Sequence, residues 1–216
     1  MTWFAAALAD KRLDATKIST LDLPLPRLWR VYAKRFAVDG FNRTHLGQAR
    51  FSPLEVAGTI VPTLYAASTL EVALMETVWH DAPSPSHGFH LVLNEATEPR
   101  RVGSLKPSAA LRLVDLTALG LRRLGLARSD VIDSDPAGYA ITRQLGAWLY
   151  KNKPDAQGIF WVSRQNDEGR AVVLFEPRLG AVKFEVDTED EVFTDGSHLD
   201  ALLTLAQRMG ASVIVR

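Results

Sequence analysis

The 216-residue sequence contains no cysteine, so it can form neither a disulfide nor a thiolate metal site, and it has no thiol nucleophile. An excess of one charge is also missing, because 25 basic and 25 acidic residues give a net charge of zero. Nucleic-acid-binding proteins usually carry a basic excess, so we expect no direct contact with DNA or RNA.

No segment approaches the ~18 apolar residues of a membrane span, and the N-terminus lacks the basic start of a signal peptide. We therefore expect a cytoplasmic protein that does not insert into membranes.

Several motifs that mark ligand sites are absent as well. There is no P-loop and no G-x-G-x-x-G, so a glycine-rich phosphate-binding loop is not indicated. The five histidines are scattered, and His87 and His90 have no third ligand at metal spacing, so we expect no metal site. Ser163 does not lie in a G-x-S-x-G elbow, which argues against an esterase-like nucleophile.

The length suits one domain, residues 1–216, with a sizeable core. Strands and helices do not alternate strictly, so the sequence predicts an α+β fold, a mixed β-sheet core with flanking helices. A polar loop that ends in glycine joins two apolar runs, at 158–163 and 171–177, which predicts an antiparallel hairpin. Further strands are predicted at 27–33, 62–68, 88–95, 111–116, 181–186 and 211–215, and helices at 69–80, 135–151 and 197–210. Residues 81–88 are predicted to form a loop.

The helix predicted at 69–80 contains an unexplained carboxylate. Ser68 and Glu71 have the spacing of a capping box, which accounts for Glu71. Glu76 lies on a helix that is apolar nearly all round, and such helices are buried between layers. A buried unpaired carboxylate costs several kcal/mol or neutralises. Glu76 therefore points into a cavity or meets a distant arginine, and His80 is the one local residue that could be its partner. The ordinary alternatives are that Glu76 forms a purely structural Glu–Arg pair or that it lies on a solvent-exposed flank of the helix.

Two arginines also lie among apolar residues. Arg30 is in the middle of the predicted strand at 27–33, and Arg50 precedes the sequence FSP. The planar guanidinium suits phosphate or carboxylate groups, although a surface side chain that extends to solvent is the plain alternative for each. Ser163 ends a predicted strand, where it can contact a ligand or simply form a turn.

Five short motifs, in this order and spacing, together identify a family. They are WRVY (29–32), G-x-x-RFSP (47–53), LYAAST-x-E-x-AL-x-E (64–76), GI-x-x-x-SR (158–164) and VVLFEP (172–177). This pattern resembles the RES domain, the toxin of the RES–Xre toxin–antitoxin systems of bacteria. The match covers about residues 28–176, whereas residues 1–25 form an N-terminal extension without an assigned role.

The resemblance implies a fold similar to that of ADP-ribosyltransferase toxins of the diphtheria type. It also implies destruction of cellular NAD+ by cleavage of the nicotinamide–ribose bond with water or phosphate. NAD+ is then the substrate, no cofactor is needed, and an Xre-like antitoxin is the inhibitory partner. Mono-ADP-ribosylation of a protein target is the alternative within the same cleft. A non-catalytic nucleotide-binding or partner-binding module is the alternative from another class.

The resemblance also assigns roles to residues. Glu76 would stabilise the oxocarbenium-like transition state on the ribose, and Tyr65 would stack on the nicotinamide. Arg30 and Arg50 would hold the pyrophosphate, and Ser163 would fix the nicotinamide side. The positions that match the family's functional residues are Arg30, Tyr32, Arg50, Tyr65, Glu76 and Ser163.

Overall fold

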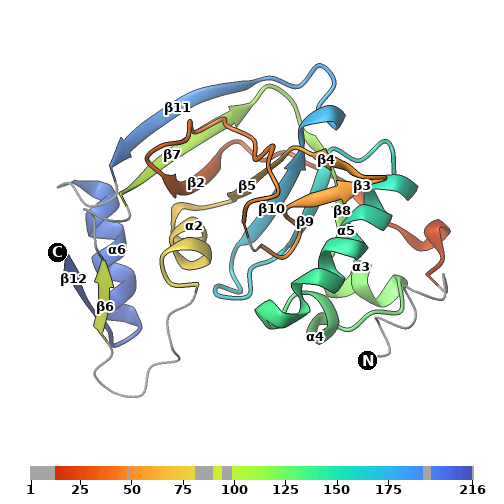
Figure 1. The fold of residues 1–216 in the computed structure, drawn as a ribbon. Helices are drawn as coiled ribbons and strands as arrows, with labels where there is room; N and C mark the ends of the chain where they lie inside the picture. The colour runs from red at the N-terminus through yellow and green to blue at the C-terminus, as the bar shows by residue number, and fades with distance from the viewer. Residues whose placement is uncertain (1–12, 48, 81–89, 94–98, 192–195, 216) are drawn as a thin grey trace.

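The computed structural model describes residues 13–47, 49–80, 90–93, 99–191 and 196–215. Its main feature is a curled eight-stranded sheet (Figure 1). Along the sheet the strands are β1 (Thr20–Leu23), β8 (Leu111–Asp115), β9 (Gly158–Val162), β10 (Arg170–Phe175), β5 (Thr63–Ala67), β2 (Leu28–Ala33), β7 (Arg100–Pro107) and β11 (Phe184–Glu191). The pair β8–β9 is parallel and the other neighbours are antiparallel, so the predicted α+β fold with a mixed sheet is confirmed.

Two small sheets accompany the large one. Strands β3 (Leu54–Val56) and β4 (Thr59–Val61) form a hairpin whose two turn residues, Ala57 and Gly58, both have positive φ. Turns of this kind match the twist of a two-residue hairpin. At the far end of the molecule, β12 (Ser212–Val215) runs parallel to β6 (His90–Leu93).

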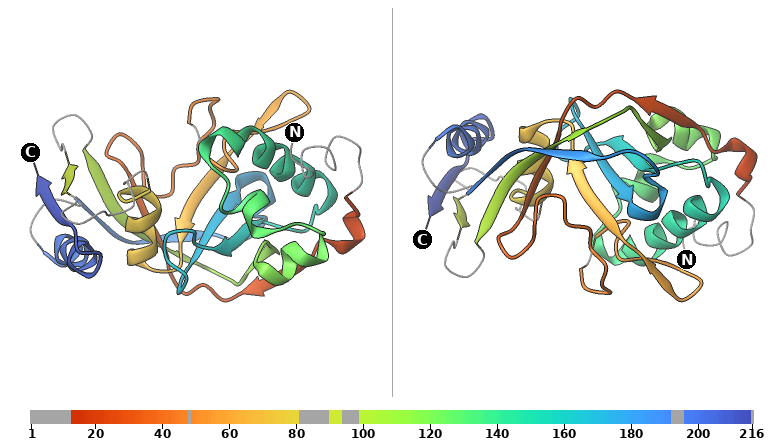
Figure 2. Two further views of the ribbon diagram at one scale, coloured as in Figure 1. Left: turned by 90° about the horizontal axis from the view of Figure 1, so that it is seen from below. Right: turned by 90° about the horizontal axis from the view of Figure 1, so that it is seen from above.

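The helices lie in two groups, one toward each side of the molecule (Figures 1 and 2). They are α2 (Leu70–Thr77), α3 (Ala118–Arg123), α4 (Arg128–Val131), α5 (Tyr139–Asn152) and α6 (Ser197–Arg208), with short 3₁₀ turns at Ala15–Lys17, Pro136–Gly138 and Glu176–Arg178. One core cluster packs α3, α4 and α5 against β9 and β10. A second joins α2 and α6 to β2 and β7. Helix α2 therefore lies between the sheet and α6, as its apolar surface predicts.

The sequence identified most of these elements, and three of its details are wrong. The helix begins after Thr69, whose hydroxyl accepts from the amide of Val72 and is the N-cap. Ser68 does not cap the helix, because its hydroxyl accepts from the amide of Arg170. The helix ends at Thr77, earlier than expected. The strand predicted at 181–186 is shifted to Phe184–Glu191. The loop predicted at 81–88 lies outside the described residues.

Part of the N-terminal extension belongs to the fold. Strand β1 pairs with β8 at one edge of the main sheet, and Leu13 and Ile18 are buried in the cluster beneath α5. This segment therefore completes the core at the edge of the sheet.

Candidate active site

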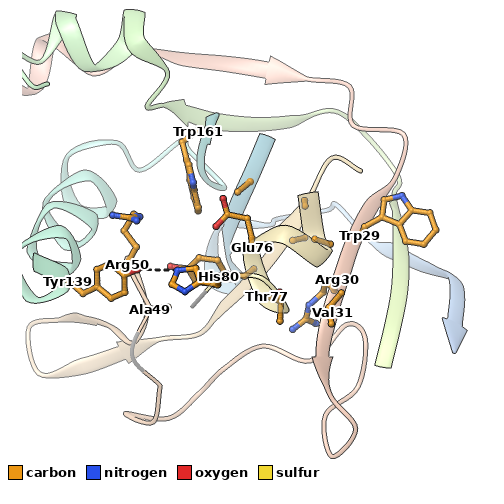
Figure 3. A pocket seen from close by; sticks show the side chains of 15 residues that line it. Trp29, Arg30, Val31, Ala49, Arg50, Glu76, Thr77, His80, Tyr139 and Trp161 are labelled. Atoms are coloured by element: carbon orange, nitrogen blue, oxygen red, sulfur yellow. Dashed lines mark hydrogen bonds between the residues drawn. The ribbon is translucent and has the colours of Figure 1, made fainter. Parts of the chain in front are cut away.

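The candidate site is a cavity of about 310 Å³ where α2 and α5 meet the centre of the sheet (Figure 3). Small side chains create the space. Ala67 on β5 faces Ala171 on β10 in the strand register, and both line the cavity together with Ala73 of α2. Larger residues at these positions would fill the volume. The cavity is therefore encoded by alanines on neighbouring strands.

Four of the residues singled out from the sequence line this one cavity: Arg30, Arg50, Tyr65 and Glu76. Figure 3 shows Glu76 on α2 with Arg50 on one side of it and Arg30 on the other. The segments that carry them are far apart in the chain, so the fold brings together side chains from β2, β5, α2 and the segment before β3. The three charged side chains that the sequence places among apolar residues, Arg30, Arg50 and Glu76, therefore line the same cavity.

Glu76 is half-buried and is held from one side. Its Oε1 accepts from the hydroxyl of Ser163 at 2.5 Å and from the backbone amide of Arg164 at 3.1 Å. Within the described residues these are its only hydrogen bonds, and neither donor is a cationic side chain. Of the two expected alternatives, a cavity or a distant arginine, the structure shows the cavity: the donors to Oε1 are a hydroxyl and an amide, and Oε2 is left for a ligand.

Ser163 is fully buried and orients this carboxylate. Its hydroxyl oxygen accepts from the amides of Gln165 and Asn166, at 3.0 and 3.1 Å. A hydroxyl has one proton and two acceptor lone pairs, so with both lone pairs in use the proton is directed to Glu76. Ser163 is not among the described residues that line the cavity. Its observed contact is with Glu76, and not with the space expected to receive nicotinamide.

The turn after Ser163 is packed tightly against α2. A Cβ on Gly169 would lie 2.1 Å from Cγ2 of Val72, in the first turn of the helix. The carbonyl of Gly169 accepts from the amide of Ser163 at 3.0 Å, which closes the turn. This close approach brings the Ser163 hydroxyl and the Arg164 amide within reach of Glu76.

Arg50 is a buried cation, with 7 % of its surface exposed. Its Nη1 donates to the carbonyl of Val131 and to the hydroxyl of Ser134. Its guanidinium lies 5.0 Å from the ring centroid of Tyr139, a cation–π contact. The hydroxyl of Thr142 on α5 donates to the Arg50 carbonyl at 2.6 Å. Burial lowers the pKa of Arg50, and the charges of nearby groups, including Glu76, oppose that shift.

Arg30 is also held by backbone carbonyls. Its Nη1 donates to the carbonyls of Val38 and Gly40, in the loop that follows β2. Burial lowers the pKa of Arg30 to about 10, so it is still a cation at neutral pH. In the described part of the chain, the hydrogen bonds of both arginine side chains use Nη1 alone, so Nε and Nη2 are the edges with which either could bind an anion.

Tyr65 forms one wall of the cavity. Its hydroxyl accepts from the amide of Phe51 at 2.7 Å, and its ring lies edge-on to Trp161 with the centroids 6.1 Å apart. Burial raises the pKa of Tyr65, so the hydroxyl is neutral. Tyr65 and Trp161 therefore present a fixed aromatic corner to any bound ring.

Tyr32 is separate from this group. It is buried, and its hydroxyl donates to Oε1 of Glu189 on β11 at 2.6 Å. Burial, with a further contribution from Glu189, raises the pKa of Tyr32. It lines a neighbouring cavity and not the one that contains Glu76. The structure thus places Tyr32 beside the site, with its ring 5.3 Å from the Arg30 guanidinium carbon.

Sequence reasoning missed two aromatic residues and misjudged a histidine at this cavity. Trp161 and Tyr139 line it. His80, considered as a partner of Glu76, also lines it, but its Nε2 lies 3.2 Å from the hydroxyl of Tyr139 (Figure 3). The alternation of strand residues 158–162 could have placed Trp161 on the same face as Ile159, but nothing in the sequence pairs α5 with α2. This part of the site depends on the tertiary arrangement.

The described residues contain no group of three or more potential metal ligands. None of the helices in the described ranges is long and apolar enough to cross a bilayer.

Comparisons with known proteins agree with this architecture. A family model described as the RES domain matches residues 27–194. Among solved structures, a chain in the crystal structure of the M. tuberculosis MbcT–MbcA toxin–antitoxin complex is similar, with a TM-score of 0.56 and 14% sequence identity. The alignment covers 97% of the present chain and 98% of that one. No curated protein matches the sequence. At this identity the structural likeness establishes a shared fold.

Proposed function

Because the chain belongs to the RES domain family, we propose that it is the toxin of a type II toxin–antitoxin system and that it depletes cellular NAD+. The reaction breaks the bond between nicotinamide and ribose. The structural likeness to a chain of a toxin–antitoxin complex supports the general function. The geometry around Glu76 supports the specific chemistry.

The proposed reaction proceeds through a ribose cation. The electron pair of the breaking C–N bond goes to the nicotinamide nitrogen and neutralises its charge, so the leaving group needs no strong acid. Positive charge develops on the ribose, where a carboxylate stabilises it most effectively in a site that excludes water. Water or phosphate then forms the new C–O bond, and water loses a proton. The products are nicotinamide and either ADP-ribose or its phosphorylated form.

The observation that carries this proposal is the arrangement of Glu76. Two donors, the Ser163 hydroxyl and the Arg164 amide, converge on Oε1, and Glu76 itself lines the cavity. Such fixation lets Oε2 face a reacting sugar without reorganisation, which is the condition for electrostatic catalysis. The other half of the carboxylate is anchored by the protein.

The remaining residues have supporting roles in this proposal. Tyr65 and Trp161 supply the aromatic corner for the nicotinamide ring. Arg50 and Arg30 lie on either side of Glu76, and their Nε and Nη2 groups can bind the NAD+ phosphate that adjoins the nicotinamide ribose. Ser163 acts through Glu76. No metal or bound cofactor is required, since NAD+ is the substrate.

The test is the fate of NAD+ incubated with the purified protein. We expect nicotinamide to be released without any cell extract, with ADP-ribose as the second product in plain buffer or its phosphate in phosphate buffer. Consumption of NAD+ that requires extract and labels a protein would instead identify a mono-ADP-ribosyltransferase. An NAD+ pool that remains intact under all three conditions would identify a non-catalytic module.

A partner follows from the same proposal. An enzyme that drains NAD+ from the bacterial cytoplasm must be inhibited in its own cell, and an Xre-like antitoxin is the inhibitor that the family implies. An antitoxin segment that enters the cavity would place a carboxylate beside Arg30 or Arg50. The neutral net charge of the chain leaves DNA contact to that partner.

A further inference from the structure

The turn that fixes Glu76 is itself held from outside the cavity. Nη2 of Arg128 donates to the carbonyl of Ser163 at 3.0 Å. Arg128 is the first residue of α4, and in the described part of the chain it does not line the cavity. Any effect of Arg128 on the site therefore passes through the backbone of the turn.

Asp133 orients the guanidinium of Arg128. Its Oδ1 accepts from Nε of Arg128 at 3.0 Å, and its amide donates to the Arg128 carbonyl at 3.0 Å, at the end of α4. Nε and Nη2 form one edge of the planar guanidinium, so this edge spans the Asp133 carboxylate and the Ser163 carbonyl. The rigid fork thus fixes the turn relative to α4.

On its other side the turn contacts α2. The Ser163 hydroxyl and the Arg164 amide both donate to Oε1 of Glu76. Nε2 of Gln165 donates to the carbonyl of His80 at 3.3 Å, just beyond the end of the helix. The turn therefore lies between α4 and α2 and is bonded to both.

The segment 128–134 also supports Arg50. Nη1 of Arg50 donates to the carbonyl of Val131 and to the hydroxyl of Ser134. The Ser134 carbonyl accepts from Nη1 of Arg50 at 3.4 Å and from Nη1 of Arg164 at 3.3 Å. This segment thus supports the buried cation directly and the catalytic carboxylate through the turn.

The contact of Arg128 with the turn has more effect on local order than on global stability. The side chains of Arg128 and Asp133 are 31% and 41% exposed, and exposed ion pairs contribute little to the free energy of unfolding. The Ser163 carbonyl belongs to a fully buried residue, and a buried carbonyl that loses a donor is destabilised. Loss of the guanidinium should therefore loosen the turn more than the whole fold.

We propose that Arg128 is a positioning residue for Glu76, which ties the turn after β9 to α4 and so keeps the two donors of the turn on the carboxylate. The catalytic consequence rests on the NAD+-cleaving function proposed above, whereas the tether itself can be measured without catalysis. The ordinary alternative is that Arg128 supports only the packing of α4.

The first experiment measures the order of the turn by NMR hydrogen exchange in the full-length protein. In Arg128→Gln the amides of residues 164–166 should exchange at least about tenfold faster than in the wild type, because the turn opens locally. The core amides of β9 and β10 should change far less. Asp133→Asn retains the guanidinium and removes the charge that orients it. This substitution of an exposed residue should give the same effect in weaker form and tests the tether even if Arg128→Gln does not fold.

Arg178 provides a matched control. It is also a half-buried arginine that donates to backbone carbonyls, those of Pro154 and Tyr150, and it is absent from the described lining of the cavity. Arg178→Gln should leave both the exchange of the turn amides and NAD+ turnover unchanged. Equal acceleration of exchange in the two arginine variants, or unchanged exchange in Arg128→Gln, would overturn the proposal.

The second experiment measures steady-state kinetics with NAD+. Arg128→Gln should lower kcat about tenfold and change KM less than about twofold, because a misplaced carboxylate weakens transition-state stabilisation and not substrate binding. A rise in KM without a decrease in kcat would contradict the role. In the Glu76→Gln protein the further substitution Arg128→Gln should have no additional effect on the residual turnover, since both act through one carboxylate. Effects that multiply would show that Arg128 acts independently of Glu76 and would reject the proposal.

The two measurements separate the tether from the proposed function. Faster exchange of the turn amides in Arg128→Gln, in a protein whose wild type does not consume NAD+, would support the tether and refute the proposed function. Cleavage of NAD+ by the wild type, with turn amides and kcat unchanged in Arg128→Gln, would refute the tether and leave the proposed function intact.

Discussion

The hydroxyl of Ser163 and the carboxylate of Glu76 act as one unit, since the serine proton has a single destination. The catalytic role proposed for Glu76 depends on its charge and not on its shape. We predict that Glu76→Gln lowers NAD+ turnover at least about a hundredfold, the effect of removing one preorganised electrostatic group. Glu71→Gln, on the exposed side of the same helix, should retain full activity. Near-normal turnover in a folded Glu76→Gln protein would exclude the carboxylate from the mechanism.

Ser163 is a positioning residue in this account. We predict that Ser163→Ala lowers kcat for NAD+ about tenfold or more, because Oε1 of Glu76 loses its closest donor. The amides of Gln165 and Asn166 also lose their acceptor, at a cost of about 1–3 kcal/mol in the free energy of unfolding. Chemical denaturation and steady-state kinetics measure the two effects separately.

A second buried serine provides the control. Ser104 on β7 is equally buried and hydrogen-bonds Thr188 at 2.8 Å, and it is not among the described residues that line the cavity of Glu76. Ser104→Ala should reduce stability by a similar amount and leave kcat unchanged. If both variants lose activity in proportion to stability, Ser163 has a structural role alone.

At this scale the sequence predicted the charged residues better than their contacts. Glu76, Arg50 and Arg30 were recognisable because a charge in an apolar segment requires a partner or a ligand. Their hydrogen-bond partners could not be predicted, because backbone carbonyls and amides occur along the whole chain and no sequence pattern marks the ones that pair with a side chain. Trp161 and Tyr139 resemble ordinary core aromatics, so only the packing of distant elements identifies them as cavity residues.

Helix α2 positions Glu76, and its first turn is fixed by Thr69. The Thr69 hydroxyl caps the amide of Val72 at 3.3 Å. We predict that Thr69→Ala lowers the free energy of unfolding by about 1 kcal/mol, the usual value of an N-cap. Thermal denaturation should show a decrease of about 2–4 °C in Tm for a chain of this size. Thr69→Ser retains the hydroxyl and should retain the stability; an equal loss in both variants would contradict the capping role.

The capping error shows where local sequence rules fail. Ser68 and Glu71 fit the motif, yet the adjacent strand β10 offers Ser68 the amide of Arg170, at 3.0 Å.

Strand β7 was not predicted from the sequence and β11 was misplaced, and in both cases contacts with a distant segment decide the structure. They contain many charges, which suggest a loop, but cross-strand ion pairs such as Lys106–Asp187 and Arg101–Glu189 stabilise them. The hairpin of β9 and β10, with its apolar runs and polar turn, was predicted correctly.

The whole molecule is organised by the order of its strands, which no local pattern contains. Strand β1 begins the sheet and β11 ends it, whereas β10 and β5 are its two central strands and β2 lies next to β5. The residues of the site thus come from strands at the middle of the sheet and from helices on either side of the cavity. Similarity to a solved fold at 14% identity over 97% of the chain indicates that this arrangement tolerates wide sequence change.

The proposed function makes a prediction for the living cell. Expression of this chain alone in a bacterium should lower NAD+ and arrest growth, because nothing restrains the cavity, whereas Glu76→Gln produced at the same soluble level should do neither. Co-expression of the Xre-like antitoxin proposed as the partner should restore growth and yield a complex that copurifies with the chain. Inhibition by a segment in the cavity requires that NAD+ compete with the partner, so the purified complex should regain activity as NAD+ is raised. Normal growth and NAD+ levels during abundant soluble expression of the wild-type chain would contradict a restrained toxin.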